Sequence, residues 1–350
     1  MKISIYTLNC VGGAENVILN IAKLLHLDKK DFIINLIDVK GSNLPKLEPL
    51  VNKEFNYQII SWKNQISFMY ELYKSIKKEQ PDIIFSSARH INVRLLILKK
   101  IFFKKKKFLI RNDNTFSSLK NYKKKFFKCI YKYANKIICQ TSEMESELKN
   151  YNIPSSLLQT IYNPIDKEKI DKLKKESNPF EENSFKYIAV GRLSYQKGFD
   201  LLIKAFNKVI KSNPKSKLYI LGDINYNNKK TYNELKQLIN QNNLKESVIF
   251  LGYQENPYKY LENANVFVLS SRWEGLPNVL LEAKYIGIPI VATDCIPIIE
   301  KLVKSEDNGY LVKNNDIDSI ADGMLKAQTI SWNKPDFTDS NKEWLNIFKV

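Results

Sequence analysis

The sequence predicts an α/β protein built from two doubly wound domains, each with a parallel sheet covered by helices on both faces. Three observations lead to this prediction. Short apolar runs alternate with segments of helical periodicity, and the same alternation restarts in the second half of the chain. The length of 350 residues suits two domains of ordinary size.

The first half begins with a short apolar run that predicts a strand over residues 3–7. Gly12 and Gly13 follow soon afterwards and indicate a turn. After these glycines, apolar residues recur every three or four positions and predict a helix over residues 14–27. Short apolar runs predict further strands over residues 32–37, 83–86, 108–110 and 136–140. Helical periodicity returns over residues 67–79 and 122–134.

The second half repeats this scheme, with strands expected over residues 187–190, 218–221, 248–251, 266–269 and 290–292. Helices are expected over residues 199–212, 231–242 and 277–286, where Pro277 suits a first helical position. Pro164 and the lysine-rich stretch after it mark the boundary between the halves. We therefore expect a first domain over residues 1–163, a linker over 164–183, a second domain over 184–330 and a C-terminal helix within 331–350.

The net charge of +18 is unevenly distributed along the chain. Residues 1–175 contain 33 lysines and arginines against 16 acidic residues, whereas the remainder contains 22 against 21. A compositional bias of the genome would raise the content of basic residues similarly in both halves. Because the excess lies in the first half, this half is expected to face an anionic surface. A nucleic-acid-binding protein is disfavoured, because no nucleic-acid-binding motif is visible and charge alone gives no specificity.

Other compositional features limit the setting in which the protein works. No stretch of about eighteen uncharged apolar residues occurs, so no membrane-spanning helix is expected. The first residues read as a strand rather than a signal peptide. The four cysteines are scattered and only two histidines occur, which disfavours a structural zinc site. A reduced, cytoplasmic setting is therefore expected.

The most informative stretch runs from Ser270 to Ala283 and reads SSRWEGLPNVLLEA. It places Glu274 in a loop after a predicted strand and Glu282 about one turn into the following helix. Between them, the first backbone N–H groups of the helix are unpaired and partly positive, so they suit phosphate groups. A carboxylate inside the helix can accept hydrogen bonds from a ribose diol. The pattern therefore predicts a site for a phosphorylated sugar.

Three further landmarks precede this stretch: a glycine loop at residues 12–15, Asn163-Pro164-Ile165-Asp166, and Gly191-Arg192-Leu193 followed by Lys197-Gly198-Phe199-Asp200. Together with Glu274 and Glu282, and in this order, they resemble the retaining glycosyltransferases of family 4. The resemblance covers almost the whole chain. It implies the GT-B fold, in which two Rossmann-like domains face each other across a cleft and the C-terminal helix crosses back to the first domain.

By the same resemblance, the second domain binds the sugar donor. Arg192 and Lys197 would neutralise the departing diphosphate, because charge on a leaving group needs either fixed cations or a metal. Glu282 would bind the ribose hydroxyls, and Glu274 would contact the donor sugar or its phosphate. The other donor-site residues that the resemblance implies are Gly13, Gly275, Leu276, Asn278 and Val279.

In the first domain, His90 follows a predicted strand and is a candidate to contact the reacting sugar or the acceptor. A lone histidine more often has a structural role, so both interpretations stay open. Asp113 is a second candidate, in a region where relatives often carry a histidine and this chain has none. Glu15 opens a helix, where the helix dipole favours an acidic residue in any case.

Asp316-Ile317-Asp318 matches the Asp-x-Asp pattern of metal-dependent glycosyltransferases. A helical start follows this pattern, so we predict that the carboxylates cap the helix and hold no metal. Transfer is therefore expected to proceed without a metal and without a cofactor.

Lysines and phenylalanines alternate over residues 99–108 and 123–128, which we call the basic aromatic face. Most of these phenylalanines are expected to pack inward. The rest would form a membrane-facing patch with the lysines, since a lysine near an anionic leaflet contributes about 1 kcal/mol and interfacial aromatics add to this. Acceptors in the resembled family are often lipid-linked, so we expect peripheral attachment to the cytoplasmic face of the inner membrane.

The sequence thus predicts a bacterial enzyme that moves a hexosyl or N-acetylhexosaminyl group from a nucleotide sugar to a glycan or polyprenyl-linked acceptor. By resemblance, UDP is the favoured nucleotide, with GDP left open. The resemblance also implies that the anomeric configuration is retained and that the product belongs to cell-surface polysaccharide or glycoconjugate synthesis. A nucleotide-sugar epimerase of the same architecture is the alternative. The donor sugar, the acceptor, the linkage and the oligomeric state are not predicted.

Overall fold

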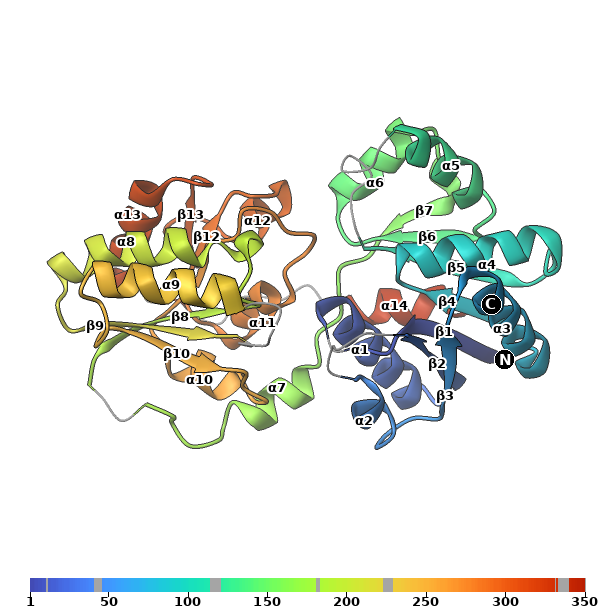
Figure 1. The fold of residues 1–350 in the computed structure, drawn as a ribbon, viewed down its shortest axis with the longest axis horizontal. Coiled ribbons are helices and arrows are strands. Elements are labelled where there is room, and N and C mark those ends of the chain that lie inside the picture. The colour runs from blue at the N-terminus through green and yellow to red at the C-terminus, as the bar shows by residue number, and fades with distance from the viewer. Residues whose placement is uncertain are drawn as a thin grey trace. The chain divides into compact units, whose positions relative to one another are not determined.

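The computed structural model describes residues 1–10, 12–40, 46–113, 121–180, 183–222, 229–330, 332 and 340–349. The chain divides into two compact units (Figure 1). Unit 1 comprises Met1–Ile165 and Asp339–Val350, and unit 2 comprises Asp166–Thr338. Each unit is an α/β body with one parallel sheet, as the alternation in the sequence predicts.

Unit 1 is built on a seven-stranded sheet in the order β3-β2-β1-β4-β5-β6-β7, and all neighbouring strands pair in parallel. The strands are β1 (Lys2–Leu8), β2 (Asp31–Val39), β3 (Tyr57–Trp62), β4 (Ile83–Ser86), β5 (Lys107–Asn112), β6 (Lys136–Cys139) and β7 (Leu158–Thr160). The chain reverses its direction of winding between β1 and β4, which pair directly. In doubly wound sheets the carboxyl edge at such a switch point is where ligands bind.

Helices cover both faces of this sheet because successive strand residues point to opposite sides. On one face, Ile3 and Ile5 pack with α1 (Gly13–Leu27), α2 (Glu48–Val51) and α14 (Asn341–Ile347). On the other face, Tyr6 and Ile84 pack with α3 (Gln65–Glu79), α4 (Arg89–Ile101), α5 (Asn121–Tyr131) and α6 (Ser142–Asn150). The C-terminal helix α14 is part of unit 1, and its Trp344 is 1% exposed.

Unit 2 has a six-stranded parallel sheet in the order β10-β9-β8-β11-β12-β13. Its strands are β8 (Phe185–Val190), β9 (Ser216–Leu221), β10 (Val248–Gly252), β11 (Val266–Leu269), β12 (Ile290–Thr293) and β13 (Gly309–Val312). One face packs against α8 (Phe199–Ser212), α9 (Lys229–Gln241) and α13 (Ile317–Lys326). The other packs against α10 (Tyr258–Asn263), α11 (Asn278–Ile286) and α12 (Pro297–Leu302), and α7 (Lys167–Leu173) contacts α10 and α11.

Several short elements were not predicted from the sequence. They include β3, β7 and β13, together with helices α2, α4, α6, α7, α10 and α12. The strand β7 has only three residues, and β3 lies at a sheet edge with a mostly half-exposed pattern, so neither gives a clear apolar run. The expectation that Pro277 is the first helical residue is wrong. It is the N-cap, with an extended ψ of 109°, and α11 begins at Asn278.

None of the helices in the described part of the chain is both long enough and apolar enough to cross a bilayer.

Candidate functional site

Two loops at the carboxyl edge of the unit 2 sheet are joined by hydrogen bonds. One follows β8 and the other follows β11, and these two strands are direct neighbours in the sheet. The backbone N–H of Arg272 donates to the Gln196 carbonyl at 2.7 Å, and the Ser270 hydroxyl donates to the Lys197 carbonyl at 2.9 Å. The two motifs that the sequence singled out, residues 191–200 and 270–283, therefore form one structural unit.

Gly198 makes this close approach possible. Its φ is +63°, in the left-handed region that side chains other than glycine rarely adopt. A Cβ added there would lie 2.1 Å from the Ser270 carbonyl oxygen, so any side chain would push the loops apart. The tight turn also ends the short 3-10 helix Tyr195–Lys197 and starts α8.

Lys197 and Glu274 form an ion pair at the centre of these loops. The Lys197 Nζ lies 2.6 Å from Glu274 Oε1, and the Ser271 hydroxyl donates to the same oxygen at 2.6 Å. The side chains are only 15% and 8% exposed, so the pair is largely shielded from solvent. A cation held by a single carboxylate in a sheltered loop can be shared with an anionic ligand that brings additional oxygens.

Arg192 lies beside this pair in sequence and is exposed. Among the described residues, no ion-pair or hydrogen-bond partner of its guanidinium is found. It is the second cation that the sequence predicts for the diphosphate, and the structure leaves it solvent-accessible.

A second arginine, Arg272, fixes the loops in place. It donates to both carboxylate oxygens of Asp200, at 2.9 and 2.7 Å, and its guanidinium lies 3.8 Å from the centre of the Tyr195 ring. Bidentate and stacked arginines are held in a defined geometry. The sequence analysis gave Arg272 no role, although its position two residues before Glu274 offered a signal.

Glu282 lies in the second turn of α11 and is half-buried. Tyr258, from the start of α10, donates its hydroxyl to Glu282 Oε1 at 3.4 Å. Burial raises the pKa of Glu282 to about 7, and this rise is opposed by Tyr258 and Lys169. The sequence predicted Glu282 but missed Tyr258, because the two residues come from different helices.

The other predicted donor-site residues lie around the start of the same helix. Gly275 and Leu276 belong to the loop before Pro277, and Leu276 is buried at 6% exposure. Asn278 is the first residue of α11, and Val279 is partly buried against the core under this edge of the sheet. The first N–H groups of α11 therefore begin directly after the loop that holds Glu274.

In unit 1, a buried arginine forms hydrogen bonds with polar residues at the carboxyl edge of the sheet. Arg111, in β5, is 1% exposed and donates to Ser87 Oγ at 2.7 Å and to Asn163 Oδ1 at 2.8 Å. Burial lowers its pKa to about 10, while the charges of Asp113 and Glu15 oppose this, so Arg111 is a cation at neutral pH. The predicted residues Asp113 and Glu15 therefore share one electrostatic environment, although Arg111 itself was missed.

Gly12 and Gly13 lie at the switch point of this sheet, where Gly12 caps α1 and Gly13 is its first residue. A Cβ on Gly12 would lie 2.6 Å from Glu15 Oε2, so the glycine leaves room for this buried carboxylate.

His90 lies in the first turn of α4, a helix that was not predicted. Its ring is 5.2 Å from the centre of the Trp62 ring, and its carbonyl accepts from Arg94 at 2.5 Å. Burial and the charge of Arg94 lower the pKa of His90 to about 4, so its imidazole is neutral at physiological pH. A neutral ring can still accept or donate a hydrogen bond, but it carries no positive charge.

The Asp-x-Asp pattern belongs to the start of α13. Asp316 caps the helix by accepting from the Ser319 N–H at 3.0 Å, which confirms the capping prediction for this residue. Asp318 pairs with Lys208 instead of capping. Within the part of the chain that is described, no cluster of three or more His, Cys, Asp or Glu residues is arranged to hold a metal.

Comparison with known sequences assigns both halves of the chain. The profile of "Glycosyl transferases group 1" matches residues 170–341, and that of "Glycosyltransferase Family 4" matches residues 11–169. The chain is a family 4, group 1 glycosyltransferase. It is therefore an enzyme, and its two Rossmann-like units are those of the GT-B fold.

Individual relatives agree with this assignment. An uncharacterized glycosyltransferase of Methanocaldococcus jannaschii is 38% identical over 251 residues, which are 65% of this chain and 59% of that protein. The Escherichia coli UDP-Gal:α-D-GlcNAc-diphosphoundecaprenol α-1,3-galactosyltransferase is 29% identical over 91% of this chain and 85% of its own. Among solved structures, Anabaena Alr3699/HepE in complex with UDP-glucose aligns with a TM-score of 0.80, at 18% identity and 99% coverage of both chains.

We expect nucleotide binding by this glycosyltransferase to strengthen as pH rises. Below about pH 7 the Glu282 carboxyl is protonated and loses acceptor capacity, and above it the carboxylate can accept from a ribose diol. The dissociation constant of UDP should therefore fall by about tenfold between pH 6 and pH 8 through this group. Calorimetric titration at several pH values measures the change. Since UDP also titrates, the Glu282→Gln variant is the control, and an identical pH profile in this variant would contradict the assignment.

Proposed function

We propose that this glycosyltransferase transfers a sugar from a UDP-sugar to a glycan or polyprenyl-linked acceptor, with retention of the anomeric configuration. The observation that carries the proposal is the Lys197–Glu274 pair, held between two loops at the carboxyl edge of the unit 2 sheet and followed directly by the N-terminus of α11. The E. coli relative, whose name specifies UDP-Gal and a diphosphoundecaprenol-linked acceptor, supports the same substrate classes. The product would enter cell-surface polysaccharide or glycoconjugate synthesis.

In this proposal each residue acts on a defined part of the donor. Lys197 and Arg192 neutralise the diphosphate as the bond to the sugar breaks, and the N–H groups of α11 at Asn278 and Val279 bind its oxygens. Glu282 binds the ribose hydroxyls. Glu274, released from Lys197 when the diphosphate arrives, contacts the donor sugar. Fixed cations in these places take the part that a divalent metal plays in other transferases, so no metal is required.

Unit 1 would bind the acceptor. Asp113 and the neutral His90 are the candidates to contact the reacting sugar or the acceptor hydroxyl, and Arg111 positions Asp113 electrostatically. The assignment of these unit 1 residues rests on their position at the carboxyl edge of the sheet.

The release of UDP tests the reaction. A transferase releases UDP from a UDP-sugar in proportion to glycosylated acceptor, whereas an epimerase leaves the nucleotide attached and changes only the sugar. NMR of the anomeric proton in the product distinguishes retention from inversion. Interconversion of UDP-sugars without acceptor-dependent UDP release would replace our proposal with the epimerase, and activity that is lost with chelator and restored by manganese would contradict metal independence.

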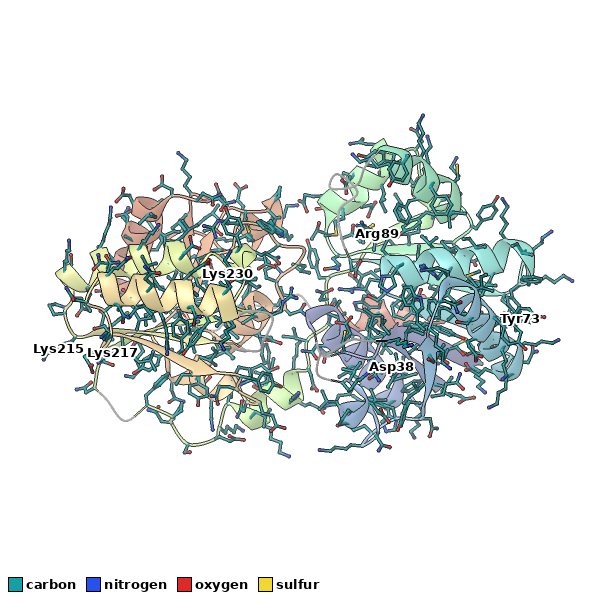
Figure 2. The ribbon with its side chains drawn as sticks, viewed as in Figure 1. Asp38, Tyr73, Arg89, Lys215, Lys217 and Lys230 are labelled. Atoms are coloured by element: carbon teal, nitrogen blue, oxygen red, sulfur yellow. The ribbon has the colours of Figure 1, made fainter. Side chains whose placement is uncertain are left out.

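We also propose that the basic aromatic face attaches the enzyme to the cytoplasmic face of the membrane. Phe103, Phe108 and Phe127 pack against the core of unit 1, as expected for most of the phenylalanines. Phe102 and Phe126 instead remain 59% and 48% exposed. Phe102 packs edge-on against Tyr73, which Figure 2 labels, with ring centres 5.0 Å apart. Exposed aromatics beside lysines suit an anionic lipid interface.

Replacement of Lys124, Lys125 and Lys128 in α5 by glutamine should weaken binding to anionic vesicles. Each lysine contributes about 1 kcal/mol near an anionic surface, so the loss should reach about one hundredfold. Co-flotation with phosphatidylglycerol-containing vesicles measures it, and pure phosphatidylcholine vesicles are the reference. Equal recovery of the unmodified protein with both kinds of vesicle would rule out electrostatic attachment.

A further inference from the structure

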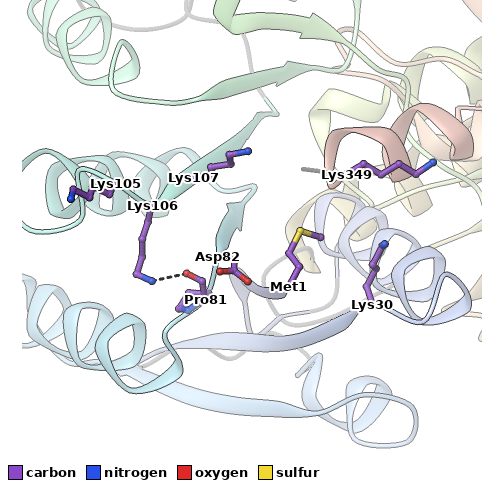
Figure 3. A pocket seen from close by; sticks show the side chains of 8 residues that line it. All are labelled: Met1, Lys30, Pro81, Asp82, Lys105, Lys106, Lys107 and Lys349. Atoms are coloured by element: carbon purple, nitrogen blue, oxygen red, sulfur yellow. Dashed lines mark hydrogen bonds between the residues drawn. The ribbon is translucent and has the colours of Figure 1, made fainter.

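An open pocket of about 810 Å³ lies in unit 1 and is lined mainly by lysines (Figure 3). Its charged residues are Lys30, Lys105, Lys106, Lys107, Lys349 and Asp82. They come from four separate places in the chain: the turn after α1, the turn before β4, the segment that leads into β5, and the end of the chain after α14.

The pocket lies at the edge of the sheet where the strands begin. Lys30 immediately precedes β2, Asp82 precedes β4, and Lys107 is the first residue of β5. Because the strands are parallel, this edge is opposite to the one where Gly13 and Asp113 lie. The pocket is thus separate from the residues proposed for transfer, and a ligand in it would not be the reacting sugar.

The charges in the pocket are unbalanced. Among the described residues that line it, the one carboxylate is that of Asp82, which already accepts the Lys2 backbone N–H at 2.8 Å. Lys30 pairs with Asp28, outside the lining, at 3.4 Å. For Lys105, Lys107 and Lys349, no carboxylate within 4 Å of the ammonium group is found among the described residues. Positive charges gathered in a concave surface raise the local potential and attract anions.

One of the lysines is held in place by the fold. Lys106 donates to the Pro81 carbonyl at 2.8 Å, which ties the segment before β5 to the turn before β4 (dashed in Figure 3). The Lys107 backbone N–H also donates to the Asp82 carbonyl at 3.3 Å, which joins the same two segments. The lysines therefore come from separate segments around one concave surface and do not lie along one solvated helix.

We propose that this pocket is a second anion site, which binds a phosphate-bearing group of two or more negative charges. Lysine ammonium groups donate up to three hydrogen bonds each and suit phosphate oxygens as point charges. With about 810 Å³ against ~30 Å³ for one water in the liquid, the pocket has room for a phosphate group together with hydrating water. A soluble diphosphate and the head groups of anionic lipids share this chemistry, and the experiment must distinguish them.

The test compares two triple variants of the full-length protein. The pocket variant carries Lys105→Gln, Lys107→Gln and Lys349→Gln, and the control carries Lys211→Gln, Lys215→Gln and Lys245→Gln. The control residues are exposed lysines of unit 2, with the same change of charge, and Lys215 and Lys245 lie just before β9 and β10 at the equivalent edge of its sheet (Figure 2 labels Lys215). Both variants and the unmodified protein are titrated with inorganic pyrophosphate in saturating UDP, and separately with phosphatidylcholine vesicles with and without phosphatidylglycerol.

We expect the pocket variant to bind one of these probes about tenfold more weakly than the unmodified protein, while the control variant binds it equally well. A loss confined to pyrophosphate identifies a soluble phosphate ligand. Because Lys105 and Lys107 also belong to the basic aromatic face, a loss confined to anionic vesicles identifies a lipid head group in the pocket only if Lys349→Gln alone, which lies outside that face, reproduces part of it. The proposal is overturned if the unmodified protein binds neither probe, or if the pocket and control variants behave alike with both.

Discussion

Replacement of Lys197 by alanine is expected to lower kcat for sugar transfer by roughly 10²–10³-fold, the range seen when one fixed donor to a developing negative charge is removed. Two effects act together. The diphosphate loses a cation that the Gly198 turn and Ser270 hold in place, and Glu274, at 8% side-chain exposure, loses the partner of its charge. Acceptor-dependent UDP release measures the rate.

The matched control is Lys208→Ala. Lys208 also pairs with a carboxylate of unit 2, Asp318, but its side chain is 49% exposed and that of Asp318 is 81% exposed. Exposed pairs contribute only about 0–1 kcal/mol, so this variant should keep its activity. Lys197→Arg keeps the charge and should recover part of the rate. A Lys197→Ala variant that turns over as fast as the Lys208→Ala control would remove Lys197 from the proposed mechanism.

The fold could be predicted because its signal is local. A strand buried on both faces needs a continuous apolar run, and its crossover helix needs an apolar stripe. For this reason β1, α1, β8 and α8 can be predicted from the sequence. The edge strand β3 and the three-residue β7 depend on the neighbours that they pair with, and these neighbours are distant in sequence. The helix α4 was not predicted, although it contains a run of apolar residues.

The candidate site was predictable to the extent that two short motifs, residues 191–200 and 270–283, carry it. The order of Arg192, Lys197, Glu274 and Glu282 along the chain was sufficient to nominate them, and the structure brings Lys197 and Glu274 into contact. Their supporting residues were missed. Tyr258 donates to Glu282 from another helix, and the charge of Arg111 interacts with Asp113 and Glu15, and no spacing in the sequence encodes these contacts.

For His90, the sequence could not predict the charge state of the side chain. From the sequence it was a candidate to contact sugar, and its residue type left the charge state open. Packing against Trp62 and the nearby guanidinium of Arg94 lower its pKa to about 4, so a role that needs an imidazolium near neutral pH is excluded by its surroundings.

Replacement of Trp344 by alanine should destabilise unit 1 by about 3–5 kcal/mol, the cost typical of removing a buried tryptophan. Its ring is 1% exposed and packs edge-on against Phe85, with ring centres 5.9 Å apart. Its indole N–H donates to the Tyr162 carbonyl at 2.8 Å, so the variant also leaves this acceptor without its partner. Because Tyr162 immediately precedes Asn163, to which Arg111 donates, the loss should loosen the same buried polar cluster.

Urea unfolding with and without UDP assigns the effect to one unit. A ligand stabilises only the part of the protein that binds it. UDP should therefore raise the urea concentration at the unfolding midpoint of unit 2, and Trp344→Ala should lower the midpoint of unit 1. Lys342→Ala, on the exposed side of the same helix, is the control and should change neither. If Trp344→Ala unfolds like this control, the C-terminal helix contributes little to unit 1. The proposal that the last residues of the chain complete the first domain would then have to be abandoned.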